Sequence, residues 1–307
     1  MKKVLVTGGT VFVSKTVAEF FAAKKEYDVY VLNRDTKKQL ENVTLICNDR
    51  NDLGDRLKGM HFDVVLDVTA YTKKDISDLL DGLESFDEYI MVSSSAVYPD
   101  AGKQPFKEGE PIGANQYWGT YGTDKIEAEQ ELHRRVPGAY ILRPPYLYGK
   151  YNNVYREAFV FDCAMQNRPF YLPKNGEMKM QFFLAEDLCR LMEIILDKKP
   201  KQRIFNVGNK EAISVKDWVA LCYEIVGTRL ETVPVMEDIW QREYFCFADY
   251  EYYLDVTKQY ELLKTVTPLK EGLQQAFEWY QNNQQDVGKR GYIDFIEQRW
   301  EKTNEIE

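Results

Sequence analysis

The sequence predicts an α/β protein with a doubly wound parallel sheet and a smaller, interleaved α+β portion. Short apolar runs alternate with amphipathic stretches through the first half of the chain, a pattern typical of parallel strands covered by helices on both faces. The first of these runs leads directly into a glycine-containing turn at 7–10. Beyond residue 150 the pattern changes to helical stretches interspersed with short strands. We therefore expect one domain over 1–170 and a smaller portion over 171–307, interleaved because no Gly/Ser linker separates them.

The elements of the first domain follow in order from this alternation. Apolar, β-rich runs predict strands at 3–6, 28–32, 43–46, 64–68, 89–92 and 139–142. Amphipathic periodicity predicts helices at 15–25, 74–83 and 121–135. The last strand stops at Arg143-Pro144-Pro145, where the two prolines direct the chain out of the sheet.

The second portion is expected to contain helices at 186–196, 214–226 and 269–280, with a short strand at 205–207. The segment 242–255 is rich in aromatic side chains: Tyr244, Phe245, Phe247, Tyr250, Tyr252 and Tyr253. Two interpretations of this segment stay open, an aromatic pocket or a strand with one buried face and subunit contacts.

The composition excludes several classes of protein. The chain has 307 residues and a formal net charge of −9, which disfavours binding to a nucleic-acid backbone as its main activity. Its two histidines, His61 and His133, are too few for a multi-histidine metal cluster, so we expect no metal site and a catalytic base other than imidazole. The five cysteines are widely spaced and lack a C-x-x-C pair, which predicts reduced thiols.

The start of the chain and its hydropathy lead to an expectation about location. Met1-Lys2-Lys3 runs straight into the first apolar strand, so we expect no signal peptide. No apolar run approaches the roughly 18 residues needed to span a bilayer. The expected location is the cytoplasm, with no membrane partner.

The turn after the first strand has the context of a dinucleotide-binding loop, because it follows a strand and opens a helix whose free amides face a pyrophosphate. A Gly-x-x-Gly-x-x-Gly spacing that starts at Gly8 has Val11 and Ser14 at its later glycine positions. Ser14 is small enough to keep helix and strand close, whereas Val11 stands where the backbone approaches the phosphate. We expect the cofactor to contact Gly8, Gly9, Thr10, Val11, Phe12 and Val13.

The ends of the following strands indicate which dinucleotide is bound. An Asp or Glu normally holds the adenosine ribose of NAD at the end of the second strand, but here that strand runs into Asn33 and Arg34. An uncharged residue followed by arginine favours a 2′-phosphate, and therefore NADP over NAD. Asp49, after the third strand, is expected to accept from the adenine amino group. Three further contacts are expected at strand ends: Thr69, Ala70 and Pro144.

A serine, a tyrosine and a lysine form the candidate catalytic set. The strand 89–92 is followed by Ser93-Ser94-Ser95, and the helix at 121–135 begins with Tyr121 and Lys125. A Tyr and a Lys four residues apart share a helix face, so the ammonium lowers the phenol pKa and also reaches a cofactor ribose hydroxyl. The serine hydroxyl then binds the substrate oxygen from which the tyrosinate removes a proton. Other pairs in the chain share this spacing, but this one starts a helix at the sheet's carboxyl edge.

Taken together, the loop, the catalytic set and several later motifs resemble the extended and atypical short-chain dehydrogenase/reductases, in particular the NAD-dependent epimerase/dehydratase family. The later motifs are Leu142-Arg143-Pro144-Pro145-Tyr146-Leu147-Tyr148-Gly149, Phe183-Leu184-Ala185-Glu186-Asp187-Leu188, Phe205-Asn206-Val207-Gly208-Asn209, Asp255-Val256-Thr257-Lys258 and Leu269-Lys270-Glu271-Gly272-Leu273. In detail, the sequence is most similar to the branch of this family that contains the chloroplast stem-loop-binding proteins. The resemblance covers nearly the whole chain and implies a Rossmann-type fold with an NAD(P)-binding domain.

Carried over by position, the resemblance implies Tyr121 as the base, Lys125 as its electrostatic partner and Ser94 as the hydroxyl donor, with Ser95 as the second choice for the donor. It implies Ser95, Tyr146 and Gln181 as substrate contacts. Gln181 stands where many sugar-nucleotide enzymes have the Asp of an Arg-Asp-Phe motif, and Tyr146 where many have asparagine. It also allows for a homodimer formed through the helix that bears Tyr121.

Three functions follow from these observations. The first is an NAD(P)-dependent oxidoreductase or epimerase that acts on a nucleotide sugar or a similar hydroxyl substrate. Ser95-Ala96 stand where a dehydratase has an Asp-Glu pair, which favours epimerisation or reduction over dehydration. The alternatives are an RNA-binding or regulatory protein that reuses the fold, and a cofactor-sensing pseudoenzyme.

Overall fold

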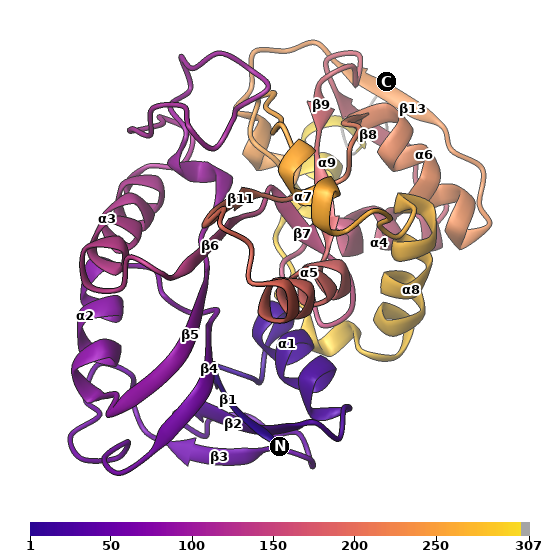
Figure 1. Cartoon of the computed structure of the whole chain (residues 1–307). Coiled ribbons are helices and arrows are strands. Elements are labelled where there is room, and N and C mark those ends of the chain that lie inside the picture. The colour runs from indigo at the N-terminus through magenta and orange to yellow at the C-terminus, as the bar shows by residue number, and fades with distance from the viewer. Residues whose placement is uncertain (302–307) are drawn as a thin grey trace. The chain divides into compact units, whose positions relative to one another are not determined.

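A computed structural model describes residues 1–301 of the chain (Figure 1). The chain forms two compact units and passes between them several times. Unit 1 comprises Met1–Leu147, Phe183–Lys210 and Tyr253–Val266. Unit 2 comprises Tyr148–Phe182, Glu211–Tyr252 and the chain from Thr267 onward. Each unit therefore draws on several separate stretches of the sequence.

Unit 1 is built on a seven-stranded sheet in the order β11-β6-β5-β4-β1-β2-β3. All its neighbouring strands are parallel. The strands are β1 (Lys2–Thr7), β2 (Tyr27–Asn33), β3 (Thr44–Cys47), β4 (His61–Asp67), β5 (Ser85–Val92), β6 (Tyr140–Arg143) and β11 (Ile204–Asn206). The strand order reverses between β1 and β4, which is where doubly wound sheets bind ligands at their carboxyl ends. The predicted fold class is confirmed.

Helices cover both faces of this sheet, as Figure 1 shows. On one face lie α1 (Phe12–Ala22) and α5 (Ala185–Lys198), and on the other lie α2 (Lys73–Gly82) and α3 (Thr120–Arg135). Successive side chains of a strand point to opposite faces. Val4 and Val6 accordingly pack into the core under α1 and α5, whereas Leu5 packs into the core under α2 and α3. The sheet therefore lies between two apolar cores, which hold its strands in place.

A buried ion pair fixes the end of β6 against α3. Arg143 donates through Nη2 to Glu129 Oε2 at 2.6 Å and through Nε to Glu129 Oε1 at 3.0 Å. Its Nη1 also donates to the Tyr98 hydroxyl at 2.9 Å. Both side chains of the pair are more than nine-tenths buried. Each charge therefore depends on the other for the stabilisation that water would otherwise provide.

The remaining elements complete both units. In unit 1 they are η1 (Ser95–Val97) and α7 (Thr257–Leu262). In unit 2 they are α4 (Glu157–Met165), β8 (Phe170–Pro173), β9 (Lys179–Met180), β12 (Ile213–Ser214), α6 (Val215–Val226), β13 (Thr232–Val235), η2 (Gln241–Glu243), α8 (Leu269–Asn282), η3 (Gln284–Asp286), α9 (Tyr292–Ile296) and η4 (Glu297–Glu301). The strands β7 (Tyr146–Tyr148) and β10 (Phe182–Leu184) lie where the chain passes from one unit to the other. Within residues 1–301 no helix is long and apolar enough to cross a bilayer.

The aromatic segment 242–255 does not form the strand that was one of its two interpretations. After η2 its backbone is irregular, with one isolated bridge at Leu254. Two of its rings, those of Phe245 and Phe247, instead pack in the core of unit 2. The Phe247 ring lies edge-on to Trp218 at 5.4 Å between centroids, and the Phe245 ring lies 6.2 Å from Phe170. Aromatic burial rather than strand pairing orders this segment.

Candidate active site

The loop between β1 and α1 requires glycine at two positions. Gly8 and Gly9 have φ values of +90° and +95°, a region that side-chain-bearing residues rarely adopt. A Cβ on Gly9 would lie 2.6 Å from Val31 Cγ1, and one on Gly8 would lie 2.7 Å from Ser14 Oγ. A serine at position 14 is small enough for this close approach. The loop therefore passes tightly between β2 and the first turn of α1.

The amino terminus of α1 is open toward this loop. Among the described residues no side chain caps the helix, and its first turn contains no acidic residue, whereas α2 has a full capping box at Thr72 and Asp75. The uncapped amides and the helix dipole favour an anion at this position. Val11 has an extended backbone (φ −136°), so this position does not itself require glycine. The left-handed conformation falls on Phe12 instead, at φ +39°.

A cavity of about 450 Å³ lies at the carboxyl ends of β1, β2, β3 and β4. Seven of the residues expected to contact a cofactor line it: Gly8, Thr10, Val11, Asn33, Arg34, Asp49 and Thr69. Gly9 and the first residues of α1, Phe12 and Val13, belong to the adjoining turn. The volume of the cavity lies within the usual range for small-molecule sites.

Asn33 organises the loop after β2. Its Nδ2 donates to the Gly8 carbonyl at 2.7 Å, and its Oδ1 accepts from the Asp35 amide at 2.9 Å. The side chain therefore links β2 to the glycine turn and offers no carboxylate to a ribose. Arg34 and Lys37 line the same cavity, and Arg34 Nη1 lies 4.0 Å from Asp49 Oδ2. This rim of the cavity carries positive charge.

A buried polar network, which no sequence motif indicated, lies at the base of the cavity. Asp67, at the end of β4, accepts from Arg50 Nη1 at 2.8 Å, from Arg50 Nη2 at 3.0 Å, from Thr7 Oγ1 at 2.8 Å and from the Tyr89 hydroxyl at 2.5 Å. Burial alone would raise the pKa of Asp67, but the Arg50 charge and these hydrogen bonds outweigh it and lower the pKa. Arg50 also donates to the Asp75 carbonyl at 2.6 Å. An aspartate that ends an apolar strand, with an arginine beyond the previous strand, is the sequence signal that could have indicated this pair.

Lys125 is buried at the junction of β4, β5 and α3. Its Nζ donates to the Ala70 carbonyl at 2.6 Å and to the Val92 carbonyl at 3.0 Å, and the residue is 2% exposed. Burial lowers its pKa to about 8, although Asp67 and Glu129 act in the opposite direction. Nζ lies 4.9 Å from the centroid of the Tyr71 ring and 6.0 Å from that of Tyr121. The structure therefore brings the predicted Tyr and Lys together at the strand ends.

Gly122 sets the position of Tyr121. A Cβ on Gly122 would lie 2.5 Å from the Ala96 carbonyl oxygen, so α3 packs directly against the turn that follows β5. Ser94 caps that turn, where its Oγ accepts from the Ala96 amide at 3.1 Å. Tyr121 remains 40% exposed at the start of α3. The close approach at Gly122 places the tyrosine beside the serine turn.

The other expected contacts are buried. The Ser95 amide donates to the Pro144 carbonyl at 2.9 Å, which joins two of these positions. The Tyr146 ring lies edge-on to Trp118 at 6.2 Å. Gln181 is 1% exposed and belongs to unit 2. The roles of these residues as substrate contacts remain predictions.

The pKa of Lys125 predicts a pH-dependent stability. Between pH 8 and the ordinary lysine pKa of 10.5, the unfolded chain keeps this proton and the folded chain releases it. The contribution of Lys125 to the free energy of unfolding therefore rises with pH across this window. The rise should be on the order of 1–3 kcal/mol. Urea unfolding of the wild type and of Lys125→Met at pH 7.5 and 9.5 isolates it, and an equal pH response of the two proteins would contradict the assignment.

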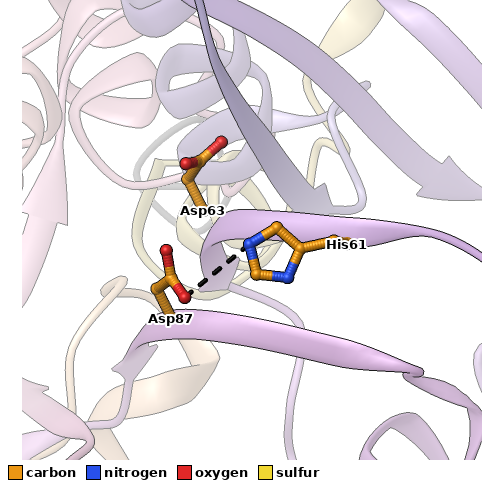
Figure 2. Close-up of side chains that lie close together, drawn as sticks. All are labelled: His61, Asp63 and Asp87. Carbon is orange, nitrogen blue, oxygen red and sulfur yellow. Dashed lines mark ion pairs between the residues drawn. The ribbon is translucent and has the colours of Figure 1, made fainter.

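A second cluster of polar side chains lies at the opposite ends of the strands. His61, Asp63 and Asp87 place their ligand atoms within 4.8 Å of one another (Figure 2). His61 Nε2 lies 3.6 Å from Asp87 Oδ1, and His61 Nδ1 lies 2.9 Å from Ser85 Oγ. His61 and Asp87 are exposed, and exposed ion pairs contribute little to stability. The cluster lies at the amino end of β4, whereas the cavity lies at its carboxyl end.

The region that holds the cavity and the candidate catalytic pair matches a known protein family. Residues 4–208, which include the cavity and the Tyr121–Lys125 pair, match the NAD dependent epimerase/dehydratase family. The chain belongs to this family. Its membership confirms the resemblance inferred from the glycine turn, the catalytic set and the later motifs.

Solved structures share the fold of this family member. The UDP-glucose 4-epimerase of Thermotoga maritima, solved with UDP-glucose, is 20% identical with a TM-score of 0.72, covering 92% of this chain and 99% of that chain. The Bordetella bronchiseptica enzyme WbmG, solved in complex with NAD, is 15% identical with a TM-score of 0.75, covering 92% of this chain and 94% of that chain. A curated relative, the chloroplast stem-loop binding protein of 41 kDa b from Arabidopsis thaliana, is 23% identical over 301 residues, which cover 90% of this chain and 78% of the relative.

Proposed function

We propose that this family member is an NAD(P)-dependent enzyme that acts on a nucleotide sugar or a similar hydroxyl substrate. The observation that carries the proposal is the buried Lys125, whose ammonium lies beside Tyr121 at the same sheet edge as the cavity. Two solved relatives bind the same classes of ligand, one in complex with NAD and the other with UDP-glucose.

The residues present fit a nicotinamide dinucleotide. Because Gly8 and Gly9 have no side chains, the backbone of the turn leaves room for a pyrophosphate. The uncapped start of α1 would supply amide donors to that pyrophosphate. When bound, the nicotinamide ring supplies the hydride acceptor and donor. Tyr121 takes the proton of the substrate hydroxyl, Lys125 stabilises the phenolate by its charge, and Ser94 donates a hydrogen bond to the substrate oxygen.

The charged rim of the cavity favours NADP over NAD. Asn33 holds the glycine turn instead of a ribose, while Arg34 and Lys37 are available for a 2′-phosphate. Asp49 lies 4.0 Å from Arg34 and limits this preference. We therefore expect both nucleotides to bind, with NADP the tighter of the two.

The substrate class is tested by incubating the protein with NADP or NAD and a panel of UDP-, dTDP- and GDP-hexoses, followed by proton NMR of the anomeric region. Conversion of one sugar to its epimer, or to a keto sugar with stoichiometric reduced nucleotide, is expected. A protein that binds the dinucleotide but converts no member of the panel would exclude these sugars as substrates.

The name of the curated relative motivates one alternative function, the binding of structured RNA. The net charge of −9 opposes it, because RNA affinity depends largely on basic side chains. A salt-dependent gel shift with a stem-loop RNA would support this alternative, and no shift at low salt would remove it.

A further inference from the structure

Tyr71 is a half-exposed aromatic residue at the edge of the cavity. It follows β4, is 52% exposed and lines the cavity opposite the glycine turn. Its amide donates to Asp75 Oδ2 at 2.9 Å, the same carboxylate that completes the capping box of α2. The backbone of Tyr71 is thereby held by α2, and the preceding carbonyl, that of Ala70, accepts from Lys125.

The Tyr71 ring lies against both members of the candidate catalytic pair. Its centroid is 4.9 Å from Lys125 Nζ, within the range for attraction between an ammonium and a ring. It is also 6.5 Å from the centroid of Tyr121, at an interplanar angle of 50°. Tyr71 therefore stands between the cavity, which it lines, and the buried ammonium.

We propose that Tyr71 is a positioning residue of the dinucleotide site, whose ring holds Lys125 in place for the nicotinamide half of the cofactor. This inference rests on the proposed function. Without the ring, the ammonium side chain would be open to water on its cavity side and would lose a partner that restricts its rotamers. The adenosine half would contact the cavity walls at β2 and β3, which the Tyr71 ring does not touch.

The protonation state of Tyr71 supports a positioning role over a catalytic one. Partial desolvation of the phenol and the nearby Asp75 raise its pKa above the ordinary value, although Arg50 acts in the opposite direction. The phenol therefore stays neutral near pH 7 and does not act as the base. The ring, and not the hydroxyl, carries the proposed role, so a phenylalanine should replace it.

The test compares a whole dinucleotide with its adenosine half. Binding of NADP and of 2′,5′-ADP is measured by isothermal titration calorimetry for the wild type, Tyr71→Phe and Tyr71→Ala. Tyr71→Ala is expected to weaken NADP binding about 10-fold and to change 2′,5′-ADP binding less than about twofold, while Tyr71→Phe behaves like the wild type. Trp240→Ala removes an aromatic residue of unit 2 that is 70% exposed and serves as the control, with both affinities unchanged.

The outcomes separate this inference from the proposed function. If the wild type binds both ligands and Tyr71→Ala weakens both equally or neither, Tyr71 has no specific role toward the nicotinamide half and the inference is overturned. If the wild type binds neither ligand, the proposed function itself fails. An unchanged melting temperature in Tyr71→Ala confirms that the variant is folded, as its half-exposed position predicts.

Discussion

Replacing Arg143 by methionine is expected to lower the free energy of unfolding by about 3–5 kcal/mol, the cost of leaving one member of a buried ion pair without its partner. Glu129 would keep a hydrogen bond from the Ser93 hydroxyl but would lose both donors of the guanidinium. The Tyr98 hydroxyl would also lose the donor at Arg143 Nη1. Urea denaturation of the two proteins at pH 7 measures the difference.

A double variant separates the effect of an unpaired charge from that of lost packing. Arg143→Met combined with Glu129→Leu removes both charges and should recover much of the stability lost in Arg143→Met, because an apolar pair needs no compensating ion. A loss of less than about 1 kcal/mol in Arg143→Met would show that Glu129 finds another partner and that the pair does not fix β6 against α3.

Replacing Tyr121 by phenylalanine is expected to reduce turnover roughly 10²- to 10⁴-fold, the usual contribution of a positioned acid or base. The substitution removes the phenolate oxygen that is proposed to accept the substrate proton and leaves the ring at the start of α3. Steady-state kinetics with a substrate identified by the nucleotide-sugar panel measures the loss. The affinity for NADP should stay within about twofold, because Lys125 and the cavity are untouched.

Tyr117→Phe provides the matched control for this prediction, since it deletes a hydroxyl from a comparably exposed tyrosine outside the predicted catalytic set. Its turnover should equal that of the wild type. Retained turnover in Tyr121→Phe would assign the proton transfer to another group, and loss of NADP affinity in the same variant would assign Tyr121 to binding.

The fold was predictable because each strand of unit 1 carries its own signal. Runs such as Val4-Leu5-Val6 are buried on both sides of the sheet, which produces uninterrupted apolar segments in the sequence. The segment 242–255 was harder, because its aromatic residues are equally compatible with a strand and with core packing by an irregular chain. Long-range ring contacts, such as that of Phe247 with Trp218, decide between them and leave no local pattern.

Site residues were predictable from the sequence where a motif fixes their spacing along the chain. Residues that meet only through long-range contacts were not. Tyr121 and Lys125 are one helical turn apart, so the sequence places them together. The Asp67–Arg50 pair joins two strand ends, and the contact of Tyr71 with Lys125 joins the end of β4 to α3. Such pairs become neighbours through the parallel register of the sheet, which no spacing along the chain records.

The central claim, that the cavity at the ends of β1–β4 binds a nicotinamide dinucleotide, is tested most directly by equilibrium titration of the wild type with NADP and with NAD. Gly9→Val is the control, because a side chain there would meet Val31 and displace the turn. We expect both nucleotides to bind the wild type, NADP more tightly by about 10-fold because Arg34 and Lys37 line the cavity, and neither to bind the variant. Absence of binding by either nucleotide to the wild type at millimolar concentration would contradict the account.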